Sequence, residues 1–371
     1  MADITLLTKE QGFAMVEKAG NIALPPNNEI VYDDKGNPSV MVKIPKLTYA
    51  DLGITTGSGT FPAWIVDGKE VPYIYISKYQ NIVSDGRAYS LPYQQPRNYV
   101  NFDEAVEFCQ AKGKGWHLIS NLEWQAIALW CAKNGCMPGG NNNYEYGDYY
   151  QTSEKGAPMP YKEYYNPDDP SEGYDEYPLT ATGSGPKSWF HNNDFSGIAD
   201  LNGNVLEWVG GIRFHNGEVQ VIPENNTALH LSQAADSSEW KAILPGTTAN
   251  NATLVAPGTS GSLVLTSGGL GVSGKDTAGS PSGVWFDRTA DVCSANLTVI
   301  PKEAYAHGLL NPGITTERQD YFSGYKSADR LCCRGGCCGD GDGRSGVFYF
   351  DGYGRSFSDY DLGFRSAFVN L

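Results

Sequence analysis

Four cysteines lie close together near the end of the chain, in the sequence CCRGGCC. Cys332 and Cys333 precede Arg-Gly-Gly, and Cys337 and Cys338 follow it. Thiolates bind metals and attack electrophiles, so such a cluster could hold zinc or do redox chemistry. The spacing favours neither, because zinc sites usually separate paired cysteines by about two residues and adjacent cysteines rarely form an unstrained disulfide. The cysteines therefore have to be explained together with the residues around them.

The stretch that contains these cysteines uses few residue types. Residues 332–361 contain only Cys, Arg, Gly, Asp, Ser, Val, Phe and Tyr, and they lack Lys, Glu, Gln, Met and Trp. Tyr offers a large rigid contact area, and Ser, Gly and Asp offer adaptable hydrogen bonds, so this composition is typical of a binding surface. An ordinary loop that is rich in Gly, Tyr and Asp is the alternative. We refer to residues 332–361 as the tail.

The overall composition limits the class of protein. The chain has 371 residues, of which 40% are hydrophobic, which suits a folded protein with a sizeable core. Its formal net charge of −15 argues against nucleic-acid binding, which requires a basic stripe. We find no secretory signal at the N-terminus and no apolar run of membrane-spanning length. We therefore expect no nucleic-acid partner and no membrane insertion.

Two helices are expected to position the tail. Asn101 is followed three residues later by Glu104, and Ser120 by Glu123, which is the pattern of a capping box. Apolar residues follow each of these starts at helical spacing, and a glycine comes after each apolar run. Both segments therefore predict amphipathic helices with one face in the core.

Three segments in order resemble a known family. They are HLISNLEWQ at the second helix, GNVLEW at 203–208, and RGG at 334–336 with a closing GFR at 363–365. Together they resemble the formylglycine-generating-enzyme (sulfatase-modifying factor) family, whose domain is a form of the C-type lectin fold. The resemblance implies an α+β, C-type-lectin-like domain with two helices around twisted antiparallel sheets, plus an inserted, partly β block.

The resemblance also implies a domain organisation. Residues 1–70 form a small N-terminal region, and residues 71–214 with 317–371 form the C-type-lectin-like domain. Residues 215–316 differ in composition, being rich in Gly, Ser, Thr and Ala, and are expected to be an insertion within it. The tail is expected to be a variable binding surface of that domain.

The tail distinguishes two branches of this family. The enzyme branch oxidises a cysteine of sulfatases with two cysteines that follow RGG, and the matching positions here hold Asp340 and Ser345. Neither residue can supply a thiolate nucleophile or a soft metal ligand. The resemblance therefore implies no enzyme and no catalytic residues, and a cysteine oxidase of the formylglycine-generating type remains the alternative.

The other branch comprises the variable proteins of diversity-generating retroelements, similar to the major tropism determinant of a bacteriophage. RGG, the GVF of residues 346–348 and GFR fall into register with the tail of that branch. In this branch a mutagenic reverse transcriptase randomises the adenines of AAC or AAT codons. The products never include Lys, Glu, Gln, Met or Trp, and the tail obeys that exclusion.

This branch implies a set of contact residues within the tail. The side chains expected to contact a ligand are Cys337, Cys338, Asp340, Asp342, Arg344, Tyr349, Asp351, Tyr353, Arg355, Phe357, Asp359, Tyr360 and Asp361. The apolar side chains expected to attach the tail to the core are Val347, Phe348, Leu362, Phe364 and Phe368.

The family resemblance also implies a structural calcium ion at the GNVLEW segment, although no cofactor is required for binding. The matching ligands are the side chains of Asp200 and Glu207 and the carbonyls of Gly203 and Val205. Hard oxygen ligands at a tight turn suit calcium. A turn closed by side-chain-to-backbone hydrogen bonds is the alternative.

These expectations define a non-enzymatic, hypervariable ligand-binding protein. The resemblance implies a protein or glycan ligand on a host or target cell surface. It places the chain on a virion, as part of a phage tail, or on a cell surface. An invariant structural virion or surface protein is a further alternative.

Overall fold

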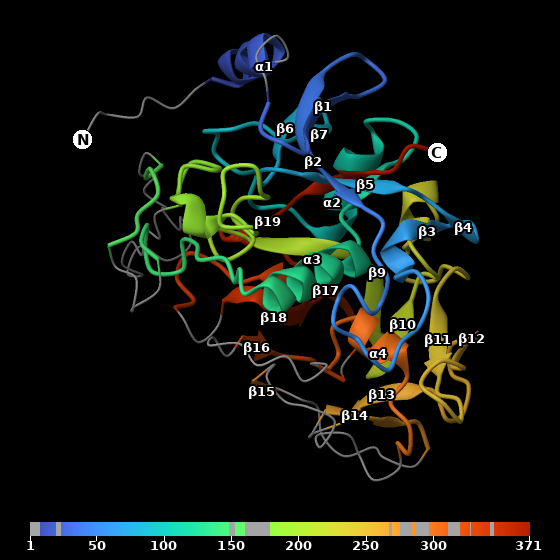
Figure 1. The fold of residues 1–371 in the computed structure, drawn as a ribbon. Coiled ribbons are helices and arrows are strands. Elements are labelled where there is room, and N and C mark those ends of the chain that lie inside the picture. The colour runs from blue at the N-terminus through green and yellow to red at the C-terminus, as the bar shows by residue number, and fades with distance from the viewer. Residues whose placement is uncertain are drawn as a thin grey trace, which may run out of the picture.

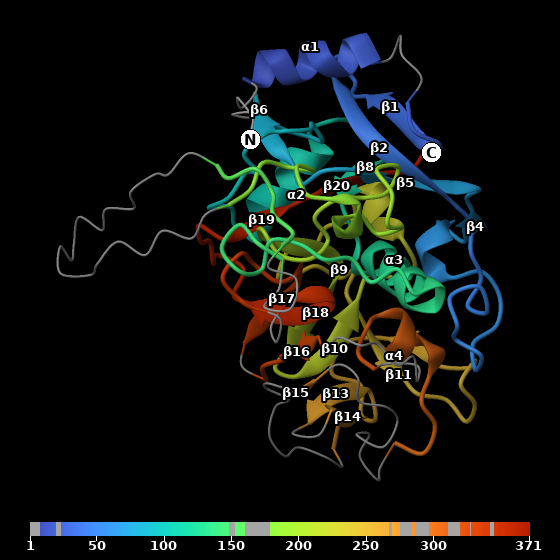
Figure 2. The ribbon, with the colours of Figure 1, turned by 60° about the vertical axis from the view of Figure 1, so that its left-hand side comes forward.

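Two mainly antiparallel sheets and two capped helices form the framework of the protein (Figures 1 and 2). The computed structural model describes residues 8–19, 24–147, 153–159, 179–266, 269–274, 284–285, 297–310, 320–326, 328–341 and 345–371. The predicted α+β class with helices around antiparallel sheets is confirmed. No helix in these ranges has the length and hydropathy that a membrane span requires.

The smaller sheet contains the C-terminal strand at an interior position. Its antiparallel strands, in spatial order, are β1 (Asn28–Tyr32), β2 (Pro38–Pro45), β5 (Tyr73–Ser77), β20 (Ser366–Phe368) and β8 (Trp116–Leu118). Because β20 pairs with both β5 and β8, the residues that follow GFR are fixed within the sheet.

The larger sheet contains the two strands to which the tail contributes, β17 and β18. Its main strands, in spatial order, are β12 (Thr253–Val255), β11 (Lys241–Leu244), β10 (Glu218–Val221), β9 (Leu206–His215), β17 (Asp329–Gly335), β18 (Gly346–Tyr353), β16 (Tyr321–Phe322) and β15 (Val284–Trp285). Strand β13 (Leu263–Thr266) pairs with β10 and with β14 (Gly269–Val272), and β19 (Leu362–Phe364) runs parallel to β9. Strand β9 thus lies between β17, β19 and β10, which makes it the centre of this sheet.

Short elements complete the described secondary structure. Two small hairpins are formed by β3 (Ile65–Val66) with β4 (Lys69–Glu70) and by β6 (Ile82–Ser84) with β7 (Arg87–Tyr89). Three short 3-10 helices are η1 (Pro62–Trp64), η2 (Lys187–Trp189) and η3 (Asn226–Leu229).

Strands of the segment 215–316 continue the larger sheet. Strand β10 pairs with β9 over four residues, and β11 and β13 pair in turn with β10. Val219 and Val221 of β10 are buried in the same hydrophobic cluster as Ile212 of β9. In both views the smaller sheet lies at the top, and β13 and β14 lie at the bottom (Figures 1 and 2).

Both predicted helices are present with the predicted caps. Helix α2 (Phe102–Gln110) begins after Asn101 and α3 (Asn121–Asn134) after Ser120, each with both hydrogen bonds of a capping box. Helix α3 ends at Gly135, whose φ of +66° suits glycine. Helix α2 ends earlier than its next glycine, with Ala111 as its C-cap. The remaining described helices are α1 (Lys9–Ala19) and the short α4 (Lys302–Ala306).

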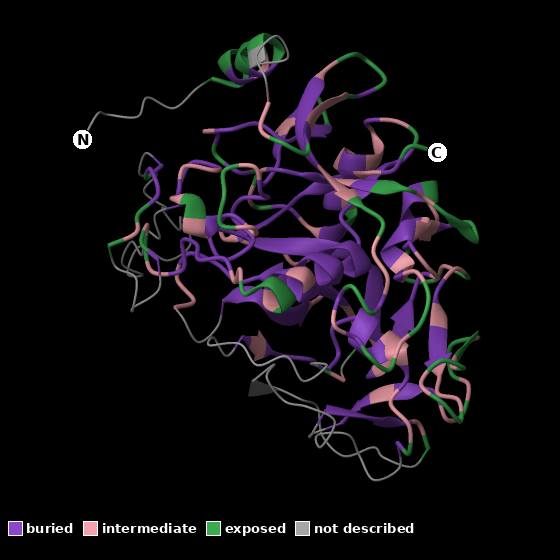
Figure 3. Cartoon of the chain, in the orientation of Figure 1, coloured by how far each residue is buried: buried purple, intermediate pink, exposed green. Residues whose placement is uncertain are grey.

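The two arginines of the RGG and GFR motifs are completely buried. Figure 3 shows that the central strands are buried as well. Arg365 donates from Nε to Oε2 and from Nη2 to Oε1 of Glu207 on β9, both at 2.6 Å. Arg334 on β17 donates to Asn121 at 2.9 Å and Gln125 at 2.8 Å, both on α3. Burial lowers the pKa of Arg334 to about 9. These contacts connect the ends of the tail to the framework.

We expect Arg365→Met to lower the free energy of unfolding by about 3–5 kcal/mol, because it leaves the buried Glu207 carboxylate without its opposite charge. The double variant Arg365→Met with Glu207→Gln removes both charges and should recover a large part of that loss. Urea unfolding of the wild type, both single variants and the double variant measures the coupling. Purely additive losses would contradict this account.

Candidate functional site

The exposed parts of the tail form one surface at the end of the larger sheet. We call its half-buried and exposed residues, 339–341 and 353–361, the tail surface. Main-chain hydrogen bonds attach both of its loops to the GNVLEW segment, since Cys338 N donates to Asn204 O at 3.1 Å and Leu206 N donates to Asp361 O at 2.7 Å. The two loops are therefore held next to each other by one short stretch of framework.

Stacked aromatic rings form the rigid part of this surface. The rings of Tyr353 and Phe357 stack with centroids 4.6 Å apart and planes at 10°. The Trp208 ring of β9 lies edge-on to Tyr353 at 6.5 Å, and its Nε1 donates to Val100 O at 2.9 Å. Such ring pairs contribute more than their buried area alone. Two half-buried aromatic side chains are thus presented on a fixed base.

Two carboxylates lie beside these rings in a poorly solvated place. The Asp351 carboxylate accepts hydrogen bonds from Tyr349 Oη at 3.1 Å and from Gly352 N at 2.7 Å. Burial raises the pKa of Asp351 and also that of Asp361, to which the Cys337 thiol donates. The tail therefore holds two poorly solvated carboxyl groups, of which Asp361 is half-buried on the tail surface and Asp351 is buried.

Arg355 is turned toward the framework. Its Nη2 donates to Gln233 O at 2.7 Å and lies 3.4 Å from Asp329, and its Nη1 pairs with Asp103 of α2. The guanidinium is thus engaged on three sides. It holds the 353–361 loop against α2 more than it is available to a ligand.

The tail cysteines are buried and are not activated. Cys332, Cys333 and Cys338 have no exposed surface, and 4% of Cys337 is exposed. A hydrogen bond to Cys338 and burial raise the pKa of Cys337, and burial raises the pKa of both thiols of β17. Nucleophilic cysteines need a lowered pKa and access to solvent. Cys332, Cys333 and Cys337 have neither property, and Cys338 has no access to solvent.

Asp340 and Ser345, at the two positions that match the cysteines of the enzyme branch, form hydrogen bonds within their own loop. Asp340 Oδ2 accepts from Cys337 N at 2.8 Å, and Ser345 Oγ donates to Gly341 O at 2.7 Å. Both side chains therefore satisfy the main chain of the loop that contains them.

The predicted contact residues fall into three groups. Those that lie outside the described residues are Asp342 and Arg344. Those that are buried are Cys337, Cys338, Tyr349 and Asp351. Those that are half-buried on the tail surface are Asp340, Tyr353, Arg355, Phe357, Asp359, Tyr360 and Asp361. Of the side chains expected to attach the tail, Val347, Phe348, Leu362 and Phe364 are buried, and Phe368 is half-buried.

Sequence reasoning missed several exposed residues at this surface. Ser356 and Ser358 are exposed on either side of Phe357. Two framework tyrosines flank the tail, with 40% of Tyr99 and 41% of Tyr144 exposed. Their main-chain nitrogens donate to Asp359 O and Cys338 O, both at 2.9 Å, and both have positive φ values, +48° and +51°. Non-glycine residues in this region are strained, and such strain concentrates at functional sites.

The residues expected to hold calcium surround an amide instead. Nε2 of Gln80 lies 3.0 Å from Glu207 Oε1 and 3.1–3.3 Å from the carbonyls of Val205, Asp200 and Gly203. The Asp200 side chain points elsewhere and accepts from Gly183 N at 2.7 Å. The amide nitrogen of Gln80, a hydrogen-bond donor, thus lies where the carbonyl oxygens converge. This arrangement of oxygen atoms around an NH₂ group does not fit a bound cation. Among the described residues, no three acidic, His or Cys side chains are grouped as metal ligands.

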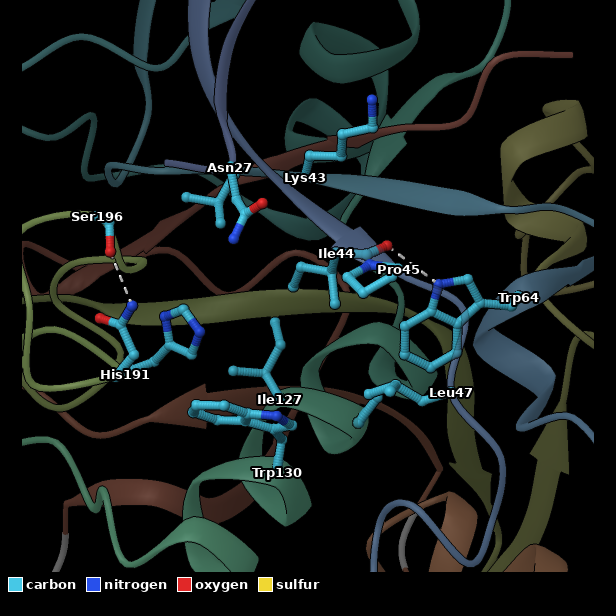
Figure 4. A pocket seen from close by; sticks show the side chains of 13 residues that line it. Asn27, Lys43, Ile44, Pro45, Leu47, Trp64, Ile127, Trp130, His191 and Ser196 are labelled. Carbon is cyan, nitrogen blue, oxygen red and sulfur yellow. Dashed lines mark hydrogen bonds between the residues drawn. The ribbon is translucent and has the colours of Figure 1, made fainter. Parts of the chain in front are cut away.

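A separate pocket is lined by residues of α3, β2 and the loop 191–196 (Figure 4). Its cavity volume is about 230 Å³, and its lining is mostly apolar, including Ile127 and Trp130 of α3. The His191 ring lies 5.3 Å from Trp130 and accepts from Ile198 N through Nδ1. Burial lowers the pKa of His191 to about 3, so the ring is neutral. None of the described residues that line this pocket belongs to the tail.

The fold and the buried GNVLEW and GFR contacts define a C-type-lectin-like domain. The chain matches the model of the sulfatase-modifying factor enzyme 1-like domain over residues 8–258, and it belongs to that family. The predicted resemblance is thereby confirmed at the level of the family. The match includes most of the N-terminal region and part of 215–316, and it ends before the tail.

Two solved structures are similar to the chain over most of its length. One is Treponema denticola variable protein 1, at 13% identity and a TM-score of 0.33. The other is PvdO from Pseudomonas aeruginosa, at 15% identity and a TM-score of 0.34. Each likeness covers 93% of this chain and 99% of the other. A comparison with curated proteins gave no match. The function therefore has to be argued from the tail itself.

We expect Asp351→Asn to raise the free energy of unfolding at neutral pH. Burial raises the pKa of this carboxyl, so the folded protein keeps the proton at pH values where the unfolded chain has lost it. Its contribution to stability therefore falls as the pH rises from the unfolded pKa of about 3.9 through the folded pKa. Urea unfolding across this pH range measures the difference between variant and wild type.

The variant's advantage should appear above the unfolded pKa and vanish below it. Asp359→Asn, on the half-buried part of the same tail, controls for the change of net charge. An advantage for Asp351→Asn that is the same at every pH would contradict the linkage.

Proposed function

We propose that this chain is a non-enzymatic, hypervariable ligand-binding protein of a diversity-generating retroelement. One observation carries the proposal. Arg334 and Arg365, near the two ends of the tail, are completely buried. The loops between them, which contain only the eight residue types of the tail, reach the surface beside framework tyrosines. A surface rewritten by mutation needs such a separation, because the framework contacts must persist while the exposed side chains change.

The state of the thiols supports a binding function over oxidation. The tail thiols are buried, and raised pKa values keep Cys332, Cys333 and Cys337 protonated. Asp340 and Ser345 replace the cysteines of the enzyme branch and bond to their own loop. We accordingly assign no catalytic residue, and we expect neither copper binding nor oxygen consumption with a cysteine-containing peptide.

The ligand we propose is a protein or glycan on the surface of a host or target cell. Half-buried aromatic rings and carboxyl groups on a fixed base are the chemistry of a paratope. The chain would then act on a phage virion, as a receptor-binding component, or on a cell surface. Calcium is not part of the proposed binding surface.

The decisive test is genomic. A near-copy of the tail's coding sequence should lie close to a reverse transcriptase gene, with adenines at the positions where the two copies differ. Sister sequences from one population should differ at exposed tail positions and agree at Arg334 and Arg365. A tail that is identical in all sisters would refute hypervariability and favour an invariant structural protein.

We expect the exposed tail positions to tolerate change and the buried apolar positions to resist it. Substitutions within the same eight residue types at the exposed Ser356 or Ser358 should change the free energy of unfolding by no more than about 0.5 kcal/mol. Phe364→Ala and Val347→Ala, which remove fully buried side chains, should cost about 2–5 kcal/mol. Protease resistance of displayed variants, followed by urea unfolding of selected ones, measures both classes.

Equal losses in the two classes would show that the tail is an ordinary part of the core. That outcome would remove the structural support for a rewritable surface, whatever the genomic context.

A further inference from the structure

The amide group of Gln80 is surrounded by more acceptors than it has hydrogens. A primary amide nitrogen carries two hydrogens, and four oxygen atoms lie within 3.3 Å of this one. Three of them are main-chain carbonyls of the loop 200–205, and the fourth belongs to the Glu207 carboxylate. The side chain of Gln80 is completely buried, so water does not share these acceptors from the bulk. Converging carbonyls of this kind require a positive centre.

The orientation of the Gln80 amide is fixed by the main chain. Thr180 N donates to Asn204 Oδ1 at 2.8 Å, and Asn204 Nδ2 donates to Thr180 O at 3.1 Å, which sets the orientation of the Asn204 amide. Asn204 Nδ2 also donates to Gln80 Oε1 at 2.8 Å. A flipped Gln80 would place its oxygen among the four acceptors and its NH₂ against another NH₂. The NH₂ group therefore faces the carbonyls.

The charge of the site is already balanced. Arg365 donates to Glu207 Oε1 at 2.6 Å and to Asp200 O at 3.2 Å, so it shares two of the four acceptors with Gln80. A cation at the Nε2 position would face this guanidinium across the same carboxylate. The distances from Nε2 are also those of hydrogen bonds, because calcium binds its oxygen ligands at about 2.3–2.6 Å.

We propose that the amide of Gln80, together with the guanidinium of Arg365, takes the place of a divalent cation at the centre of the 200–207 loop. The amide supplies the positive end of a dipole to the three carbonyls, and the guanidinium supplies the charge that Glu207 needs. The loop then holds the shape on which both tail loops rest without any metal ion. This inference is independent of what the tail binds.

The first test uses the wild-type full-length chain. Its thermal unfolding midpoint should be the same in a chelator and in millimolar calcium chloride, and the protein should carry no stoichiometric calcium by elemental analysis. A midpoint that rises with calcium, or protein purified with one calcium ion per chain, would overturn the proposal.

The second test converts the donor into a ligand. In Gln80→Glu a carboxylate replaces the NH₂ among four oxygens, so the unfolding midpoint in chelator should fall by about 5 °C or more. Millimolar calcium should restore at least half of that loss, because the position then has five oxygens around a place for a cation. An unchanged midpoint in chelator, or a loss that calcium does not reduce, would contradict the assigned role.

Gln94 provides the matched control. It is also a buried glutamine, and its Nε2 donates only weakly, at 3.4 Å, to the carbonyls of Pro92 and Tyr93. Gln94→Glu should lose stability without any response to calcium. If Gln80→Glu does not fold, the Gln80→Ala and Gln94→Ala variants decide the question. The first should have the lower midpoint, since it leaves more buried acceptors unpaired, and equal midpoints would overturn the proposal.

Discussion

The buried pair of Arg365 and Glu207 is the interaction on which the rest of the structure depends. Glu207 comes from the central strand β9, and Arg365 lies between β19, which pairs with β9, and β20 in the other sheet. The same guanidinium donates to Ser77 O of β5 and to Ala199 O before the GNVLEW turn. The guanidinium of Arg365 therefore connects both sheets and the turn by hydrogen bonds. Replacing both partners of such a pair by apolar residues often changes stability little. Removing only one partner is strongly destabilising, because it leaves an unpaired buried charge.

Under the proposed function, this arrangement would let the tail differ at its surface while its ends stay fixed. The hydrogen bonds of Arg334 and Arg365 go to framework residues or, in the case of Arg334, also to the main chain of the buried Val347, so substitutions of exposed side chains do not remove them. The separation is not complete, however, because Tyr349, Asp351 and the four tail cysteines are buried. Substitutions at those positions would lower the free energy of unfolding. The number of usable tail sequences is then smaller than the restricted alphabet alone would allow.

The sequence predicted what is local and missed what is brought together from a distance. The helix starts at Asn101 and Ser120 were predictable because a capping box is complete within four residues. The calcium expectation named residues of the 200–207 loop but could not anticipate that Gln80, which lies more than a hundred residues earlier in the chain, contacts them. Burial of Cys337 and the nearness of Tyr99 and Tyr144 to the tail follow from the packing of separate loops, which has no periodic signal in the sequence.

The chemistry of the tail cysteines follows from the same packing. Successive residues of β17 enter different clusters, with Cys332 in the cluster that contains Phe348 and Phe350, and Cys333 in the one that contains Trp208 and Tyr349. Side chains of a strand alternate between its faces, so adjacent cysteines in β17 point in opposite directions and cannot act on one metal or one substrate. Small thiols fit such packed places as apolar groups. Cys332 and Cys333 thus occupy places where a buried strand accepts small apolar side chains.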